Sequence, residues 1–139
     1  MNFYDARLQL ARFTDARVHG GLFLLTEMEE ADWSSATIVG GRLSQAKMAK
    51  VSLRGAKAAA CDFQGADLSY ADLASADLRT CRGLDQQMLS RTFGNGATML
   101  PEGLVPTEHW HLTEQDGREY QKYRAWLDAG APPGKPRKD

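Results

Sequence analysis

Apolar residues recur at every fifth position of this chain from Phe3 to Leu78, and the positions two residues before them are nearly all small. An α-helix needs apolar residues three and four apart and a strand needs them two apart, so a period of five predicts neither as a continuous run. A turn must therefore intervene every five residues, and both columns must point inward. The apolar column is Phe3, Leu8, Phe13, Val18, Phe23, Met28, Trp33, Ile38, Leu43, Met48, Leu53, Ala58, Phe63, Leu68, Leu73 and Leu78.

The period is clearest over residues 65–78, where Ala-Asp-Leu recurs three times, each five residues after the last. This stretch resembles the pentapeptide repeat family, and the resemblance extends over residues 1–80. It implies a right-handed square β-helix with one pentapeptide on each side and four in each coil. It also implies a large apolar residue in the middle of each side, a small residue beside it at each corner, and outward side chains at the other three positions.

We therefore predict an all-β solenoid over residues 1–82, a right-handed quadrilateral β-helix of about four coils. Neighbouring coils should stack at about 4.8 Å, the ordinary separation of paired strands. A bulky residue in the small column would collide with a corner, so small side chains are required there. Trp33 is the difficult member of the apolar column, because a buried indole N–H needs a hydrogen-bond partner.

The five-residue pattern ends at Gly83, and the residues after it predict a small α-helical C-terminal cap. Asp85 is a favourable N-cap for a short helix over about 86–93, with Gly94 at its end, and that helix would cover the open end of the stack. Asn95-Gly96 predicts a turn, and a second helix is expected over about 114–128. We assign 83–130 to a helical and extended cap and 131–139 to a flexible tail. The segment 84–110 also resembles an extension that follows pentapeptide repeats in a subset of bacterial proteins, which implies a bacterial source.

Charge and length limit the classes of function. The 17 basic and 18 acidic residues give a net charge of −1, which is neither the basic excess of a nucleic-acid-binding protein nor an acidic excess that imitates nucleic acid. No apolar run is long enough to span a bilayer, and the first residues lack the features of a signal peptide. We expect a cytoplasmic protein with no direct nucleic-acid contact and no membrane contact.

The candidate chemical motifs favour structural interpretations. Cys61 and Cys81 occupy the small inward column one coil apart, so we expect them to be stacked and reduced. His109-Trp110-His111 could begin a metal site, but no third ligand lies at a recognisable spacing. No serine, histidine and aspartate set occurs in a nucleophile motif. We therefore predict a protein that is not an enzyme and that uses neither a cofactor nor a metal.

The residue before each central apolar position should project outward, and its charge alternates from coil to coil. At a separation of twenty residues, opposite charges pair and like charges do not, which supports four sides per coil and predicts charge ladders down the faces. The pairs are Arg7 with Glu27, Arg12 with Asp32, Glu27 with Lys47, Arg42 with Asp62, Lys47 with Asp67, and Lys57 with Asp77.

The last coil has aspartate at all four of these positions, and we call Asp62, Asp67, Asp72 and Asp77 the acidic belt. We expect no fifth coil beneath the acidic belt. Arg79, Arg82 or Arg91 could neutralise part of it; otherwise the acidic belt is the best candidate surface for a basic partner.

Two functions are open at this stage. The favoured one is a non-enzymatic scaffold or protein-interaction module with an unknown protein partner, because flat regular sides present outward side chains. The alternative is implied by the family resemblance: some members imitate duplex DNA with an acidic β-helix and inhibit or protect a type II topoisomerase, DNA gyrase. Residues 1–80 hold ten acidic and nine basic residues, a poor imitation of a polyphosphate rod. The uncovered first coil also predicts a homodimer through one end of the stack, with the N-terminal end favoured.

Overall fold

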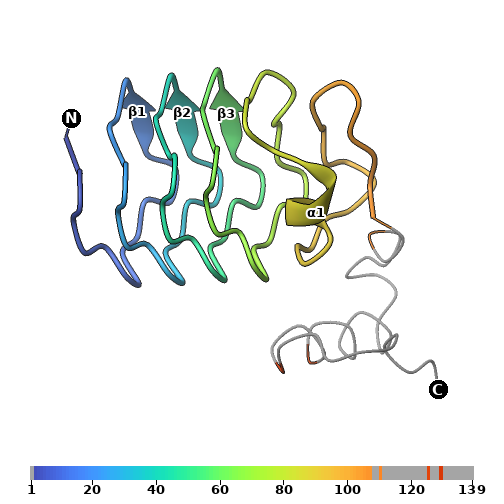
Figure 1. The fold of residues 1–139 in the computed structure, drawn as a ribbon, viewed down its shortest axis with the longest axis horizontal. Coiled ribbons are helices and arrows are strands. Elements are labelled where there is room, and N and C mark those ends of the chain that lie inside the picture. The colour runs from blue at the N-terminus through green and yellow to red at the C-terminus, as the bar shows by residue number, and fades with distance from the viewer. Residues whose placement is uncertain (1, 108–109, 111–124, 126–128, 130–139) are drawn as a thin grey trace.

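The chain winds as a right-handed quadrilateral β-helix in the computed structural model, which describes residues 2–107, 110, 125 and 129 (Figure 1). We number the coils from the N-terminus: the first coil is residues 2–20, the second 21–40, the third 41–60 and the fourth 61–80. The helix predicted over 114–128 and the tail predicted over 131–139 lie outside the described residues, apart from single positions.

One side of the β-helix is a parallel sheet of three short strands, in the order β1 (Arg17–His19), β2 (Thr37–Val39) and β3 (Lys57–Ala59). The strands run side by side along the stack in Figure 1 and pair with a register shift of one coil, so that Val18 lies opposite Ile38. The other sides are held by single parallel bridges with the same shift. The period of twenty therefore confirms that four pentapeptides make one coil.

In each of the first three coils, three of the four corners are tight turns closed by a hydrogen bond between residues three apart, and all four corners place one residue in the left-handed region. In the first turn the amide of Ala6 donates to the carbonyl of Phe3 at 2.9 Å, and Asp5 between them has a φ of 58°. Leu10 and Glu30 adopt the same conformation at 63° and 60°. Each such non-glycine residue costs roughly 1–3 kcal/mol, so the pairing with neighbouring coils must hold these turns in place.

At the corner that follows these strands, the cysteine thiols donate hydrogen bonds to backbone carbonyls of β2 and β3. The thiol of Cys61 donates to the carbonyl of Ile38 at 3.5 Å, and the thiol of Cys81 donates to the carbonyl of Ala58 at 2.8 Å. Both cysteines are free and buried, as predicted, and a hydrogen bond of 2.8 Å from Arg82 N to the carbonyl of Cys61 shows that they stand in adjacent coils. The neighbouring Cys61 thiol and burial raise the pKa of Cys81, which keeps its thiol a proton donor.

The central apolar residues fill the interior from the second coil onward. Trp33 is fully buried, stacks on Phe13 with ring centroids 4.1 Å apart, and meets Phe23 edge to face. Its indole nitrogen has no hydrogen-bond partner in the described part of the chain, so the difficulty that the sequence raises at Trp33 is real.

The C-terminal end differs from the sequence expectation in two ways. α1 covers only Gln86–Leu89, with Asp85 as its N-cap accepting from Met88 N, and Phe93 lies outside it. Phe93 instead joins the stack, since Leu73 N donates to its carbonyl at 2.6 Å. The acidic belt also has paired chain beneath it, because residues after the fourth coil form bridges with its backbone. The bridges pair Asp62 with Arg82, Asp72 with Phe93, and Asp77 with Met99.

Residues 90–107, which follow α1, lie beside the end of the stack in Figure 1. The ring of Trp110 lies so close to Gly94 that an added Cβ would come within 2.6 Å of it. The indole of Trp110 donates to the carbonyl of Thr92 at 3.0 Å. The predicted turn at Asn95-Gly96 is confirmed by a hydrogen bond from Thr98 N to Asn95 O at 3.1 Å. None of the helices in the described residues is long and apolar enough to cross a membrane.

Candidate functional site

The outward residues stack in the columns that the charge pattern predicts. All six predicted pairs of opposite charge are backbone bridge partners. Glu27 lies between Arg7 at 3.5 Å and Lys47 at 3.8 Å, so one carboxylate serves two cations. The predicted register of these columns is therefore confirmed.

The four carboxylates of the acidic belt turn back to their own backbone. Asp62 accepts from Gln64 N at 3.0 Å, and Asp67 accepts from the amide of Ser69 at 3.0 Å and from its hydroxyl at 2.6 Å. Such bonds to the residue two positions on are Asx turns, which favour aspartate and asparagine at this place in the repeat. The same bond is made by Asn2, Asp32, Asp62, Asp67, Asp72 and Asp77.

Two members of the acidic belt are also neutralised by arginines. Arg79 binds Asp77 through two guanidinium nitrogens, at 3.0 and 2.9 Å, and this hydrogen bonding holds the pKa of Asp77 below its usual range. Arg54 of the third coil binds Asp72 at 3.1 Å, a contact that the sequence analysis missed. In the sequence, this contact is marked by a separation of eighteen residues. Side-chain hydrogen bonds at the same separation link Gln9 with Glu27 and Ser34 with Ser52.

The other two arginines considered for this role are used differently. Arg82 pairs with Asp62 through the backbone, and Arg91 donates to the hydroxyl of Tyr70 at 3.1 Å with its guanidinium 6.0 Å from the ring centre. Among the described residues, Asp62 and Asp67 form no ion pair within 4.0 Å. They are the members of the acidic belt that keep a net charge toward solvent.

Charge is banded along the axis of the β-helix. The formal charge is +1 in the first coil, −4 in the second, +5 in the third and −3 in the fourth. The basic band of the third coil therefore lies between two acidic bands, as the ladder pairing requires. Its members are Arg42, Lys47, Lys50, Arg54 and Lys57.

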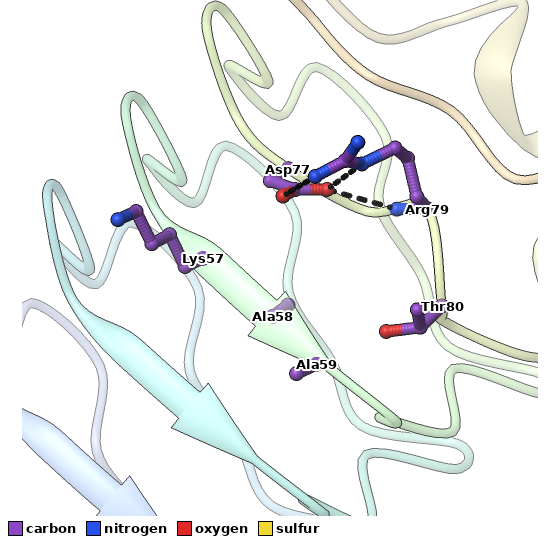
Figure 2. Close-up of a pocket in the computed structure, with 6 residues that line it drawn as sticks. All are labelled: Lys57, Ala58, Ala59, Asp77, Arg79 and Thr80. Carbon is purple, nitrogen blue, oxygen red and sulfur yellow. Dashed lines mark hydrogen bonds and ion pairs between the residues drawn. The ribbon is translucent and has the colours of Figure 1, made fainter.

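A hollow of about 330 Å³ opens on the side formed by β1 to β3, where the third and fourth coils meet. Ala58 and Ala59 line the hollow. They pair with Ile38 and Val39 of the coil before, and their side chains are smaller than those of their partners. Figure 2 shows Arg79 folded across Asp77 at one edge and Lys57 at the other. Thr80 completes the lining. The exposed lining of the hollow is thus Lys57, Ala59 and a carboxylate that Arg79 already binds, while Ala58 is buried.

The candidate metal motif is not assembled by the part of the chain that the structure describes. Within that part, no three histidine, cysteine, aspartate or glutamate side chains gather as a metal site. Trp110 is buried, and the flanking His109 and His111 lie outside the described residues.

The comparisons with known proteins agree on the type of repeat. The family model of pentapeptide repeats matches residues 46–82 with eight copies. A search of curated proteins finds no match to this chain.

Several solved structures are similar at low identity. A pentapeptide repeat protein from the thylakoid lumen of Arabidopsis thaliana shares 16% identity over 54% of this chain and 63% of its own, with a TM-score of 0.38. A pentapeptide repeat protein from Nostoc shares 24% identity over 75% of this chain and 77% of its own, with a TM-score of 0.32. QnrB1, a plasmid-mediated fluoroquinolone resistance protein, shares 20% identity over 71% of this chain and 56% of its own, with a TM-score of 0.34. The chain thus spans less than two thirds of the Arabidopsis protein and of QnrB1.

The match to the family model and the backbone geometry point to the same repeat. Eight copies match in residues 46–82, and the bridges with a shift of twenty residues begin at Asn2 and continue through those copies. Residues 46–82 of the chain match the pentapeptide repeat family, and the described backbone shows the same repeat from residue 2 onward.

Proposed function

We propose that this chain is a non-enzymatic scaffold or protein-interaction module whose partner is another protein. The observation that supports this proposal is the fixed lattice of outward side chains. Each side repeats with the spacing of paired strands, and bands of opposite charge alternate along the axis. A rigid surface of this kind can match a partner with little loss of conformational entropy on binding.

Within this surface, we propose Asp62 and Asp67 as the part of the acidic belt that meets a basic partner. Asp72 and Asp77 are bound to Arg54 and Arg79, so their charge is largely compensated. The Asx turns of Asp62 and Asp67 fix the direction of their carboxylates without neutralising them.

The alternative function, imitation of duplex DNA toward a type II topoisomerase, is less well supported by the charge distribution. A DNA-like rod needs negative charge along its length. Here the basic third coil separates the two acidic bands.

We further infer that the β-helix is a stem of four coils and that residues 81–107 and 110 form its C-terminal cap. The supporting contacts are the three bridges beneath the fourth coil and the burial of Leu89, Phe93 and Trp110. Such a cap shields the last coil from pairing with other chains.

The proposed function is tested by affinity capture with a matched pair of variants. Asp62→Asn with Asp67→Asn removes two charges from the acidic belt and keeps the oxygen that each Asx turn uses. Asp5→Asn with Asp15→Asn removes the same charge from corners of the first coil and serves as the control. A protein from the source cell should be retained by the wild type and the control and lost with the acidic-belt variant.

Retention that does not depend on Asp62 and Asp67 would contradict their assignment, and the absence of any retained protein would contradict the proposed function. A supercoiling assay with DNA gyrase tests the alternative function. We expect no change in supercoiling, and inhibition or protection of gyrase by the chain would favour the alternative.

A further inference from the structure

The side of the β-helix that carries β1 to β3 differs in charge from the other three sides. We call it the strand side, and it consists of residues 17–20, 37–40, 57–60 and 77–80. It holds three basic residues and one acidic residue, a formal charge of +2, whereas each of the other three sides of residues 2–80 has a formal charge of −1. The acidic residue is Asp77, which Arg79 already binds. The strand side is therefore suited to a partner with negative charge.

The hollow on the strand side lies where the corner geometry changes between the third and fourth coils. At the end of the third coil Ala60 has a φ of 55°, close to that of the glycines at this corner in the coils before it. In the fourth coil the corner is a tight turn, closed by a hydrogen bond of 3.1 Å from Cys81 N to the carbonyl of Leu78. The amide of Ala60 donates to the hydroxyl of Thr80 at 2.9 Å, although the same amide in the coils before it bonds to a backbone carbonyl. The hollow opens at this change of corner.

Two cations stand at the edges of the hollow. A guanidinium group has five N–H donors, and Asp77 takes only Nε and Nη2 of Arg79, which leaves Nη1 for a further acceptor. Lys57 meets Asp77 through a backbone bridge, and its amine forms no ion pair within 4.0 Å with a described residue. Figure 2 shows this amine pointing away from the carboxylate of Asp77. Both cations are exposed, and the exposed Ala59 lies between them.

The size and lining of the hollow fit a single acidic side chain. Its volume of about 330 Å³ is at the small end of the range for ligand pockets, roughly 300–1,000 Å³. The methylene groups of a glutamate can cover the methyl group of Ala59 while its carboxylate reaches Lys57 and Arg79, and hydrogen bonds between ionised partners are the stronger ones. A nucleic acid fits less well, because it binds through many phosphate contacts and Asp77 would lie among them.

We propose that the hollow of the strand side binds an acidic side chain from an extended segment of a partner protein, with its carboxylate held between Lys57 and Arg79. This inference rests on the proposed interaction function and adds a second surface, opposite in charge to Asp62 and Asp67. The rest of the segment lies along the strand side, whose net positive charge favours further carboxylates.

The proposal is tested with two short peptides and the full chain. The probe is an end-blocked hexapeptide of alternating glutamate and alanine, and the control peptide has glutamine in place of glutamate. Each is titrated into the isotope-labelled chain at low salt, and amide chemical shifts are followed by NMR. We expect the glutamate peptide to shift residues 57–60 and 77–80, the control peptide to shift none of them, and added salt to weaken the binding.

Matched variants separate charge from shape. Lys57→Gln removes one cation and should weaken binding up to about fivefold, which is what one surface ion pair supplies. Lys50→Gln removes the same charge from another side of the third coil, at a corner whose φ of 60° Gln45 also adopts at 57°, and should bind like wild type. Ala59→Leu fills the hollow without a change of charge and should abolish binding, whereas Ala49→Leu makes the same change at the same place of another pentapeptide and should not.

Several outcomes would overturn the proposal. They are unchanged shifts with the glutamate peptide, equal shifts with both peptides, shifts centred on another side, and equal affinity of the wild type and the Lys57 variant. Tighter binding of a DNA duplex at the same residues would show a site for polyphosphate instead. Concentration-dependent shifts there without any peptide would show that a second copy of the chain is the occupant. Failure of the peptide test leaves the capture result with Asp62 and Asp67 intact, so the two proposals fail separately.

Discussion

The two ends of the β-helix carry the same pattern of residues but bury it to different extents. Phe3 and Leu8 are half-buried at the N-terminal end, whereas Phe63 and Leu68, three coils later in the same columns, are 0% and 3% exposed. The fourth coil has paired chain on both sides, and the first coil has described neighbours on one side only. In a solenoid, the burial of a residue depends on its adjacent coil as well as on its own place in the pattern.

This difference predicts a gradient of local stability. The first coil makes about half of the inter-coil hydrogen bonds available to a central coil, so it should open more readily than the coils beneath it.

The largest effect should come from truncating the same residue type at the two ends. Phe63→Ala removes a fully buried ring and should cost about 3–5 kcal/mol in the free energy of unfolding. Phe3→Ala removes a half-buried ring and should cost about half as much, because less contact is lost. Urea denaturation of both variants measures this difference, and equal losses would show that the two ends are equally covered.

A second pair of variants tests how firmly the C-terminal end is covered. Gly94→Ala places a methyl group against the ring of Trp110 and should cost about 1–3 kcal/mol. Gly96→Ala is the control, because an added Cβ there meets nothing within 4 Å. The emission of Trp110 should shift to longer wavelength only in the Gly94 variant. If both variants behave like wild type, the packing of Trp110 on Gly94 is not as described.

The charge ladder allows a smaller comparison between an interior coil and the open end. Lys47→Glu places like charges above and below, at Glu27 and Asp67, and should cost about 0.2–1 kcal/mol for each neighbour. Among the described residues Arg7→Glu faces a like charge at Glu27 alone, so it should cost about half as much. Both costs should shrink in 1 M salt, where charges are screened over about 3 Å. Thermal midpoints at low and high salt provide the measurement, and a Lys47 variant as stable as wild type at low salt would contradict the stacking of this column.

The smallest effect is the pH dependence that Asp77 contributes near the C-terminal end. The pKa of Asp77 lies below its usual value of 3.8 in the folded chain because Arg79 donates to it. Its contribution to stability is therefore complete above pH 3.8 and is lost as the pH falls through the lower folded pKa. Asp77→Asn should flatten the stability profile in that acidic range, whereas Asn2, which makes the same Asx turn, is neutral and contributes no such slope. If the Asp77 variant has the same stability profile at acidic pH as the wild type, the ion pair of Asp77 with Arg79 is not the cause of the acid-dependent loss of stability.

The long-range order of this fold could be predicted from the sequence because it repeats. The five-residue period gave the inward columns, and the alternation of charge at a separation of twenty gave the pairing that the bridges confirm. Even the cysteines followed, since Cys61 and Cys81 share a column.

The local details could not be predicted, for identifiable reasons. A residue such as Leu10 gives no sign of its positive φ, because leucine avoids that conformation unless neighbouring coils impose it. Phe93 stands four residues after Leu89, a spacing that fits a helix, yet pairing with the fourth coil decides its place. The contact of Arg54 with Asp72 depends on side-chain direction, which a count of spacings does not contain.

The difference between the two ends is tested most directly by amide hydrogen exchange along one column. The amides of Glu27, Lys47 and Asp67 each donate to the coil before them, at 2.9 Å, while the amide of Arg7 has no such acceptor in the described chain. We predict strong protection of the three lower amides and exchange of the Arg7 amide close to the rate of an unstructured chain. Protection of the Arg7 amide equal to that of Glu27, in the isolated protein at low concentration, would contradict the described difference between the two ends.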